Sequence, residues 1–311
     1  MTEAPLPASA GQETPADYTQ PVDYNVLPAA QPSRSRPWLP VVSAAAVLVV
    51  VAAALFLVVG RPSGGSSLVD AATLVHAASG KAAQAGSSDV ELTMTVKAAG
   101  HTIDATGGGS FDYRRRLGQM HIEMAGFGQM QEVMTPTAMY MRLPDAMSGV
   151  LGSSGRPWLM MRYAELKKFG VDYAKLMNQG SGSDPSSMLR MLGRATQIHR
   201  AGGSTVDGLP TTKYTGSASF ADLLRAEGME SAVDLSKLPP GTGDSKLDFA
   251  VWLDKAGLPR RMQMKMAGPA FDGGSMDMTM TFLHYGTKVS VTVPPASIVT
   301  DMATFLKQNG G

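Results

Sequence analysis

The sequence predicts an α+β protein in which a single transmembrane helix precedes an antiparallel β-sheet covered by helices. Three observations support this prediction. Residues 39–59 form an apolar run without a charge. Residues 67–85 carry apolar side chains at helical spacing. After Ser88, apolar and polar residues alternate in short segments that Gly or Pro separates, which is typical of an antiparallel meander.

The composition divides the chain into four parts. Residues 1–38 are rich in Pro and poor in large apolar residues, which predicts a disordered cytoplasmic tail. Residues 39–60 are the predicted transmembrane signal anchor, whose apolar run would span about 31 Å as a helix, close to the ~30 Å core of a bilayer. Residues 61–67 are a flexible linker. Residues 68–311 are long enough for one extracytoplasmic domain.

The charges beside the apolar run predict its orientation. Arg34 and Arg36 precede it, whereas Arg61 follows it alone until Lys81. This bias favours a cytoplasmic N-terminus and a single pass through the cell membrane. A cleaved signal peptide is the rival interpretation, but its apolar region is usually about 7–15 residues long and follows a short leader. Here 38 residues precede the run, so an uncleaved anchor is favoured.

Charge and residue usage exclude several classes of function. The net charge is +1 and no basic patch is clustered, so no nucleic-acid partner is expected. The chain has no Cys, which excludes disulfides, thiolate metal sites and a lipid-modified cysteine. It has neither a Gly-x-Ser-x-Gly motif nor a phosphate loop, and its five His residues are scattered. We therefore expect no enzyme activity, no cofactor and no metal site.

The periodicity predicts the elements of the domain in order. Helical spacing predicts helices at 67–85, 163–169, 172–177, 184–193, 220–226 and 298–307. Alternation predicts strands at 90–97, 103–111, 119–124, 129–134, 138–143, 195–200, 209–217, 247–254, 261–266, 276–281 and 282–293, while 157–161 is a short apolar segment. We expect a turn at Asp207-Gly208 between two of these strands, and a bulge at Gly286 within the last one.

Six of the 22 methionines occupy alternate positions in the strands at 261–266 and 276–281. If this hairpin closes symmetrically, the facing pairs are Met266 with Met276, Met264 with Met278, and Met262 with Met280. We call these six residues the Met ladder. Three interpretations are open: ordinary core under helices, the wall of a pocket for lipid tails, or a thioether copper(I) site. Alternate strand residues are ~6.6 Å apart and no His or Cys is nearby, which disfavours copper.

Three motifs resemble a known family. They are V-D-G-L-P-T-T-K-Y at 206–214, V-W-L-D-K-A-G-L-P-R-R-M at 251–262 and V-P-P-A at 293–296. Over residues 67–311 the chain resembles the LolA-like superfamily, particularly its actinobacterial LppX/LprG-type lipoproteins. The resemblance implies a curved antiparallel half-barrel with helices across its concave side and a hydrophobic cavity between them. The lipoprotein relatives carry a lipobox cysteine that this chain lacks, so the apolar run at 39–59 would replace the acyl anchor.

The sequence and this resemblance together predict the binding of a lipid or lipidated molecule in an apolar cavity, for transfer of envelope lipids or lipoproteins at one membrane. Segments 163–194 and 220–226 would form the lid. One alternative is an envelope sensor or regulator that acts through a protein partner, and another is a structural ectodomain without a ligand. The predicted wall residues are Leu247, Phe249, Val251, Met262, Met264, Met266, Met276, Met278, Met280, Met120, Ile122, Met124, Met139 and Met141.

Overall fold

The computed structural model describes part of the domain that follows the tail. Residues 1–70, with the predicted tail, anchor and linker, lie outside the described residues, as does the predicted helix at 172–177. None of the described helices is long and apolar enough to cross a membrane. The described residues are 71–98, 100–145, 156–169, 189, 192–193, 195, 197–226, 233–237, 241–268, 273–302 and 304–305.

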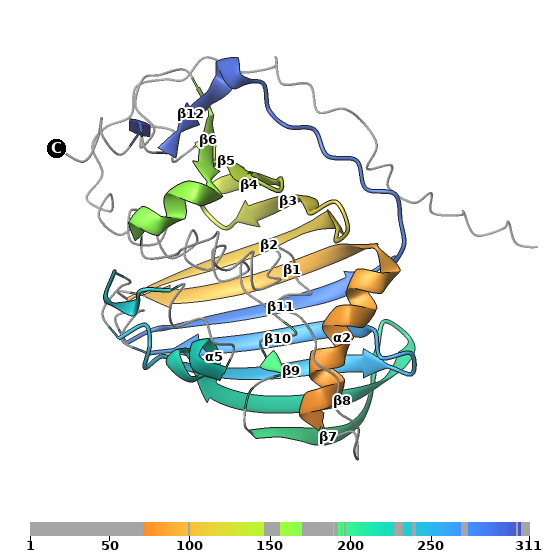
Figure 1. Ribbon diagram of the computed structural model, residues 1–311. Helices are drawn as coiled ribbons and strands as arrows, with labels where there is room; N and C mark the ends of the chain where they lie inside the picture. Colours follow the sequence, from red (N-terminus) through yellow and green to blue (C-terminus); the bar gives the residue numbers. More distant parts are fainter. Residues whose placement is uncertain are drawn as a thin grey trace, which may run out of the picture. The chain divides into compact units, whose positions relative to one another are not determined.

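The described residues form one open sheet of 12 strands (Figure 1). Its order is β12-β6-β5-β4-β3-β2-β1-β11-β10-β9-β8-β7. Every neighbouring pair is antiparallel except β12 and β6, which run parallel. The strands are β1 (Ser87–Ala98), β2 (His101–Asp112), β3 (Leu117–Met124), β4 (Gly128–Met134), β5 (Ala138–Arg142), β6 (Trp158–Arg162), β7 (Gln197–Val206), β8 (Leu209–Ser219), β9 (Lys246–Asp254), β10 (Pro259–Ala267), β11 (Ser275–Leu283) and β12 (Val299–Asp301).

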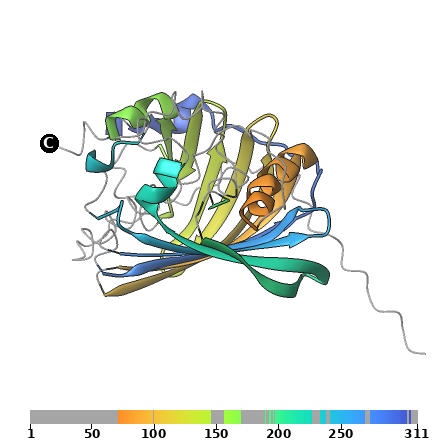
Figure 2. The same cartoon turned by 60° about the horizontal axis from the view of Figure 1, so that its bottom comes forward.

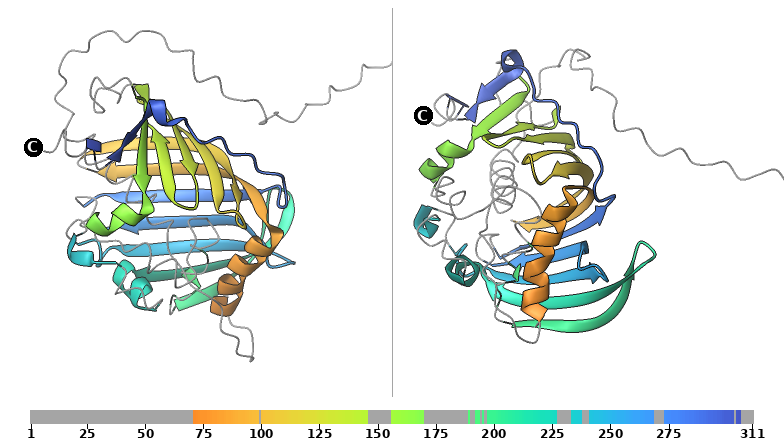
Figure 3. Two further views of the ribbon diagram at one scale, coloured as in Figure 1. Left: turned by 45° about the horizontal axis from the view of Figure 1, so that its top comes forward. Right: turned by 45° about the vertical axis from the view of Figure 1, so that its right-hand side comes forward.

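Two meanders meet in the middle of this sheet. The strands β1 to β6 run outward in one direction, and β7 to β11 return from the opposite edge until β11 pairs with β1. The β1–β11 pair joins residues nearly 200 positions apart, as in Leu92 opposite Met280. This pair therefore unites the two meanders in one sheet. Figures 2 and 3 show that the sheet curves, with helices over its concave face. The predicted antiparallel sheet is confirmed.

The helix α2 (Ala71–Ala85) covers part of the concave face. Its Ala-rich sequence favours a helix, and it ends before Gly86, whose φ of 90° suits glycine. Val75, Ala78 and Ala82 are buried in the core against the sheet. The other described helices are α5 (Phe220–Ala226) and the 3₁₀ helices η2 (Tyr163–Phe169), η3 (Leu235–Lys237) and η5 (Ala296–Ile298).

Hairpin geometry follows from a few turn residues. Asp207 and Gly208 both have positive φ, 47° and 77°, as a two-residue turn between β7 and β8 requires. At the β9–β10 turn, Asp254 Oδ1 accepts hydrogen bonds from the amides of Ala256 and Leu258, both at 2.9 Å. Arg260 Nη2 lies 2.7 Å from Asp254 Oδ2. These contacts fix the turn between β9 and β10, and β10 carries three of the six Met ladder residues.

Glycines in the middle of β2 allow close approach of β3. A Cβ on Gly107 would lie 2.1 Å from the carbonyl oxygen of His121, which is backbone and cannot move aside. A Cβ on Gly109 would likewise lie 2.1 Å from the carbonyl oxygen of Gln119. The pairing of β2 with β3 therefore requires these glycines, since a side chain at either position would force the two strands apart.

We expect Gly107→Ala to destabilise the domain by about 1–3 kcal/mol, because the added methyl group would push β3 away from β2. Urea unfolding followed by Trp fluorescence measures this change. Gly203→Ala is the matched control, since a methyl group added to Gly203 in β7 would have no neighbouring atom within 4 Å. The control should be neutral or slightly stabilising. Equal losses in both variants would contradict the steric account.

Two predictions near the C-terminus are wrong. The strand expected at 282–293 ends at Leu283, and Gly286 adopts a φ of 81° in the turn that follows. Pro294 and Pro295 lack the amide hydrogen that a strand ladder needs, so the segment before them runs without strand partners. The closing helix expected at 298–307 is wrong in its first residues, which form β12 with Val299 opposite Trp158, whereas the described residues 302, 304 and 305 are helical.

Candidate functional site

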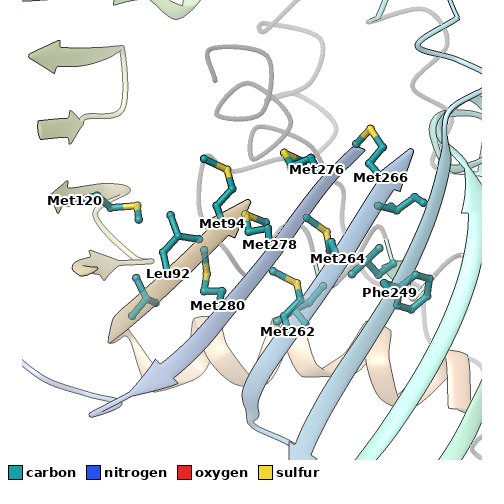
Figure 4. Close-up of a cluster of buried hydrophobic side chains, with 14 of the residues drawn as sticks. Leu92, Met94, Met120, Phe249, Met262, Met264, Met266, Met276, Met278 and Met280 are labelled. Carbon is teal, nitrogen blue, oxygen red and sulfur yellow. The ribbon is translucent and has the colours of Figure 1, made fainter. Parts of the chain in front are cut away.

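The Met ladder forms with the predicted register. Met262 lies opposite Met280, Met264 opposite Met278, and Met266 opposite Met276. Asp254 and the β9–β10 turn fix one side of this hairpin, while alternation places the six side chains on one face. Figure 4 shows them side by side on neighbouring strands.

The strands on either side extend the ladder into rows that run across the sheet. On one side β1 contributes an apolar residue to each row, and on the other side β9 does so. All twelve side chains are buried. The three rows, which we call the apolar rows, are Val251-Met262-Met280-Leu92, Phe249-Met264-Met278-Met94 and Leu247-Met266-Met276-Val96.

Residues from β1 were absent from the predicted wall. Alternation already placed Leu92, Met94 and Val96 on one face of their strand. What the sequence lacked was the pairing of β1 with β11, which local patterns do not encode. These three residues belong to the candidate site.

The remaining predicted wall residues lie on the other half of the sheet. Met120, Ile122 and Met124 come from β3, and Met139 and Met141 come from β5. They join the same buried cluster as the apolar rows, and all fourteen predicted side chains are between 0 and 7% exposed. The structure therefore brings the predicted set together on one face.

Helical segments complete the cluster. From α5, Phe220, Leu223 and Leu224 are buried in it, and η2 contributes Leu166. Leu189, within the predicted lid at 163–194, is also buried there. The parts of that lid at 170–188 lie outside the described residues. Both predicted lid regions thus contribute described side chains to the apolar face of the sheet.

One carboxyl group lies on this apolar face. Glu132 of β4 is 7% exposed and stands opposite Met120 on one side and Met141 on the other. Burial raises the pKa of the Glu132 carboxyl from 4.5 to about 7, because the apolar surroundings disfavour its charged form. Sequence reasoning missed Glu132, although its alternation with Met130 and Met134 was a usable signal.

Metal-ligating side chains form no cluster in the part of the chain that the structure describes. Among the described residues, no group of three or more His, Asp or Glu side chains could hold a metal ion. The copper(I) interpretation of the Met ladder stays a prediction. The chemistry that this face offers is the burial of apolar groups.

Comparisons with known proteins give two bacterial relatives. The chain is 27% identical over 213 residues to an uncharacterised 31.2 kDa protein of Streptomyces griseus encoded between rplA and rplJ, which covers 67% of this chain and 66% of that protein. The match thus spans less than two thirds of that relative's length. A Streptomyces coelicolor protein named as a candidate lipoprotein is 27% identical over 286 residues, or 91% of this chain and 85% of that protein. No family model matches the chain.

Solved structures to which the chain is similar include two mycobacterial proteins, one of them described as a lipoprotein. LprF from Mycobacterium bovis is 17% identical with a TM-score of 0.38, covering 74% of this chain and 99% of its own. LppX from Mycobacterium tuberculosis is 15% identical with a TM-score of 0.40, covering 70% and 98%. A LolA superfamily protein from Nitrosomonas europaea is 10% identical with a TM-score of 0.28, covering 75% and 98%. Function has to be argued from the chain's own residues.

Proposed function

We propose that this protein binds a lipid or lipidated molecule between the apolar rows and the helical segments that cover them. The observation that carries this proposal is the composition of the rows. Seven of their twelve members are Met, on three adjacent strands and one face. A core that only needs to be filled is usually built from branched and aromatic side chains with well-defined rotamers.

Methionine suits a surface that meets mobile acyl chains. Its side chain is unbranched and polarizable, so it adapts to partners of varied shape. Each methylene group that leaves water contributes about 0.8 kcal/mol, so a face of this size could retain acyl chains with few polar contacts. Covalent chemistry is not needed for this function.

The proposal includes a membrane tether. Residues 39–59 would anchor the chain, with residues 1–38 in the cytoplasm and the domain at 68–311 outside it. The naming of the Streptomyces coelicolor relative as a candidate lipoprotein supports an envelope location. A tethered domain would exchange lipid or lipoprotein at one membrane surface, because the short linker at 61–67 limits its reach.

Photo-crosslinking tests this function in the full chain. The protein is reconstituted into liposomes that contain a neutral phospholipid with a diazirine on one acyl chain, irradiated, and digested for mass spectrometry. We expect adducts on the Met ladder peptides, at 259–267 and 275–283, in addition to adducts on residues 39–59. The anchor adduct is the internal reference for membrane contact. Adducts confined to the anchor would refute lipid binding by the domain.

A further inference from the structure

Glu132 is placed where a ligand inside the domain would meet it. Along β4 its neighbours on the same face are Met130 and Met134, and across the sheet they are Met120 and Met141. All four methionines are buried in the cluster that also holds the apolar rows. Glu132 is thus flanked by four methionines, and the residue is 7% exposed.

The nearby charged side chains cannot neutralise this carboxyl group. On β3, His121 and Glu123 alternate with Met120 and are exposed on the other face. On β5, Arg142 follows Met141 and so also points to the other face, where it lies 3.7 Å from Asp145. Among the described residues, none forms a hydrogen bond or ion pair with Glu132, and burial alone accounts for its raised pKa.

A buried carboxyl without a partner destabilises a fold, so its presence among the methionines of an apolar face points to a ligand that supplies the partner. We propose that Glu132 is the polar recognition residue of the lipid-binding face and that it pairs with a protonated amine of an amphiphilic ligand. This inference rests on the proposed function and names the ligand's chemical class.

Chemistry favours an amine over the other polar groups of lipids. An ammonium group donates hydrogen bonds and also neutralises the carboxylate, which yields the strong charge-assisted type of hydrogen bond. A hydroxyl group donates a hydrogen bond but leaves the negative charge uncompensated. A carboxylate or phosphate would be repelled. The expected ligands are therefore aminolipids or long-chain primary amines.

Competition in the crosslinking assay tests this inference. Dodecylammonium, dodecanol and dodecanoate have the same chain length and differ in the head group. At about pH 8, where Glu132 is mostly ionised, we expect dodecylammonium to suppress adducts on β10 and β11 at a concentration about tenfold lower than dodecanol, as a charge-assisted hydrogen bond implies. Adducts on residues 39–59 correct for partitioning of each competitor into the bilayer.

Variants and pH separate recognition from stability. In Glu132→Gln the advantage of dodecylammonium over dodecanol should disappear, and Glu132→Met should give the same result if the amide variant folds poorly. Lowering the pH to about 5.5 should reduce the advantage in the wild type, because the carboxyl becomes neutral while the amine stays charged. Glu123→Gln is the matched control on the exposed face and should retain the full preference.

The possible outcomes separate a failure of the Glu132 role from a failure of the proposed lipid-binding function. If β10 and β11 are crosslinked but dodecylammonium and dodecanol compete equally in the wild type, lipid binding stands and the role of Glu132 is refuted. If the preference for dodecylammonium over dodecanol persists in both Glu132 variants, the role of Glu132 is likewise refuted while lipid binding stands. If β10 and β11 receive no adducts in the wild type, the proposed function fails, and the role of Glu132 fails with it.

Discussion

Met278→Trp is expected to abolish lipid crosslinking to β10 and β11 while the domain still folds. Met278 is 3% exposed and lies in the middle apolar row, between Met264 and Met94. If acyl chains occupy the space over this row, the larger indole will take their place and remain out of water. Adduct yield and urea unfolding of the full chain measure the two effects together.

Thr279→Trp is the control for this experiment. Thr279 is the next residue of β11 and points to the opposite face, so an indole there should leave crosslinking intact. The competing interpretation, a core without a ligand, predicts a different result for Met278→Trp. In a close-packed core the extra volume would destabilise the fold by about 1–3 kcal/mol or more. Such a loss of stability, together with a wild type that receives no adducts on β10 and β11, would count against lipid binding.

Removing the charge of Glu132 should increase stability above neutral pH by about 3 kcal/mol, since the pKa of this carboxyl rises from 4.5 to about 7 on folding. The sign follows from proton binding. Between these two pH values the folded state binds the proton more tightly than the unfolded state, so stability falls as the pH rises through this range. Below about pH 4.5 both states are protonated and the penalty is absent.

Glu132→Met isolates this contribution. Other carboxyl groups also titrate, and the pKa of Asp112 is lowered, so the informative quantity is the difference between variant and wild type at each pH. Urea unfolding from about pH 5 to about pH 8 should show a difference that grows with pH. A constant difference would mean that the carboxyl is not buried as described. Greater stability together with loss of amine preference would show that the carboxyl is kept for binding.

Elements that depend on neighbouring residues could be predicted from the sequence. Alternation placed the Met ladder on one face, and symmetric closure of the β10–β11 hairpin gave its register, because both features are local. The turn at Asp207-Gly208 follows from the ease with which these residues adopt positive φ. The covering helix α2 was recognised from its spacing, and its end from Gly86.

Elements that depend on partners far away in the sequence could not be predicted from it. The segment after Leu283 continues to look like a strand, but Pro294 and Pro295 and the absence of a free edge beside β1 end the pairing there. Val299 begins a strand only because β6, far away in the sequence, offers an edge. Glu132 looked like an ordinary surface acid, since its burial depends on Met120 and Met141 from the strands on either side.

By itself the sequence determined that the chain carries an uncharged apolar run at 39–59, no cysteine, and a Met ladder on one face of a hairpin. Only the tertiary structure decided that β1 lies beside β11, which turns the ladder into the apolar rows, and that Glu132 is buried on the same face. The reason is physical. Side-chain alternation is a property of one strand, whereas the neighbours of that strand, and hence the environment of a carboxyl group, are selected by the packing of the whole sheet.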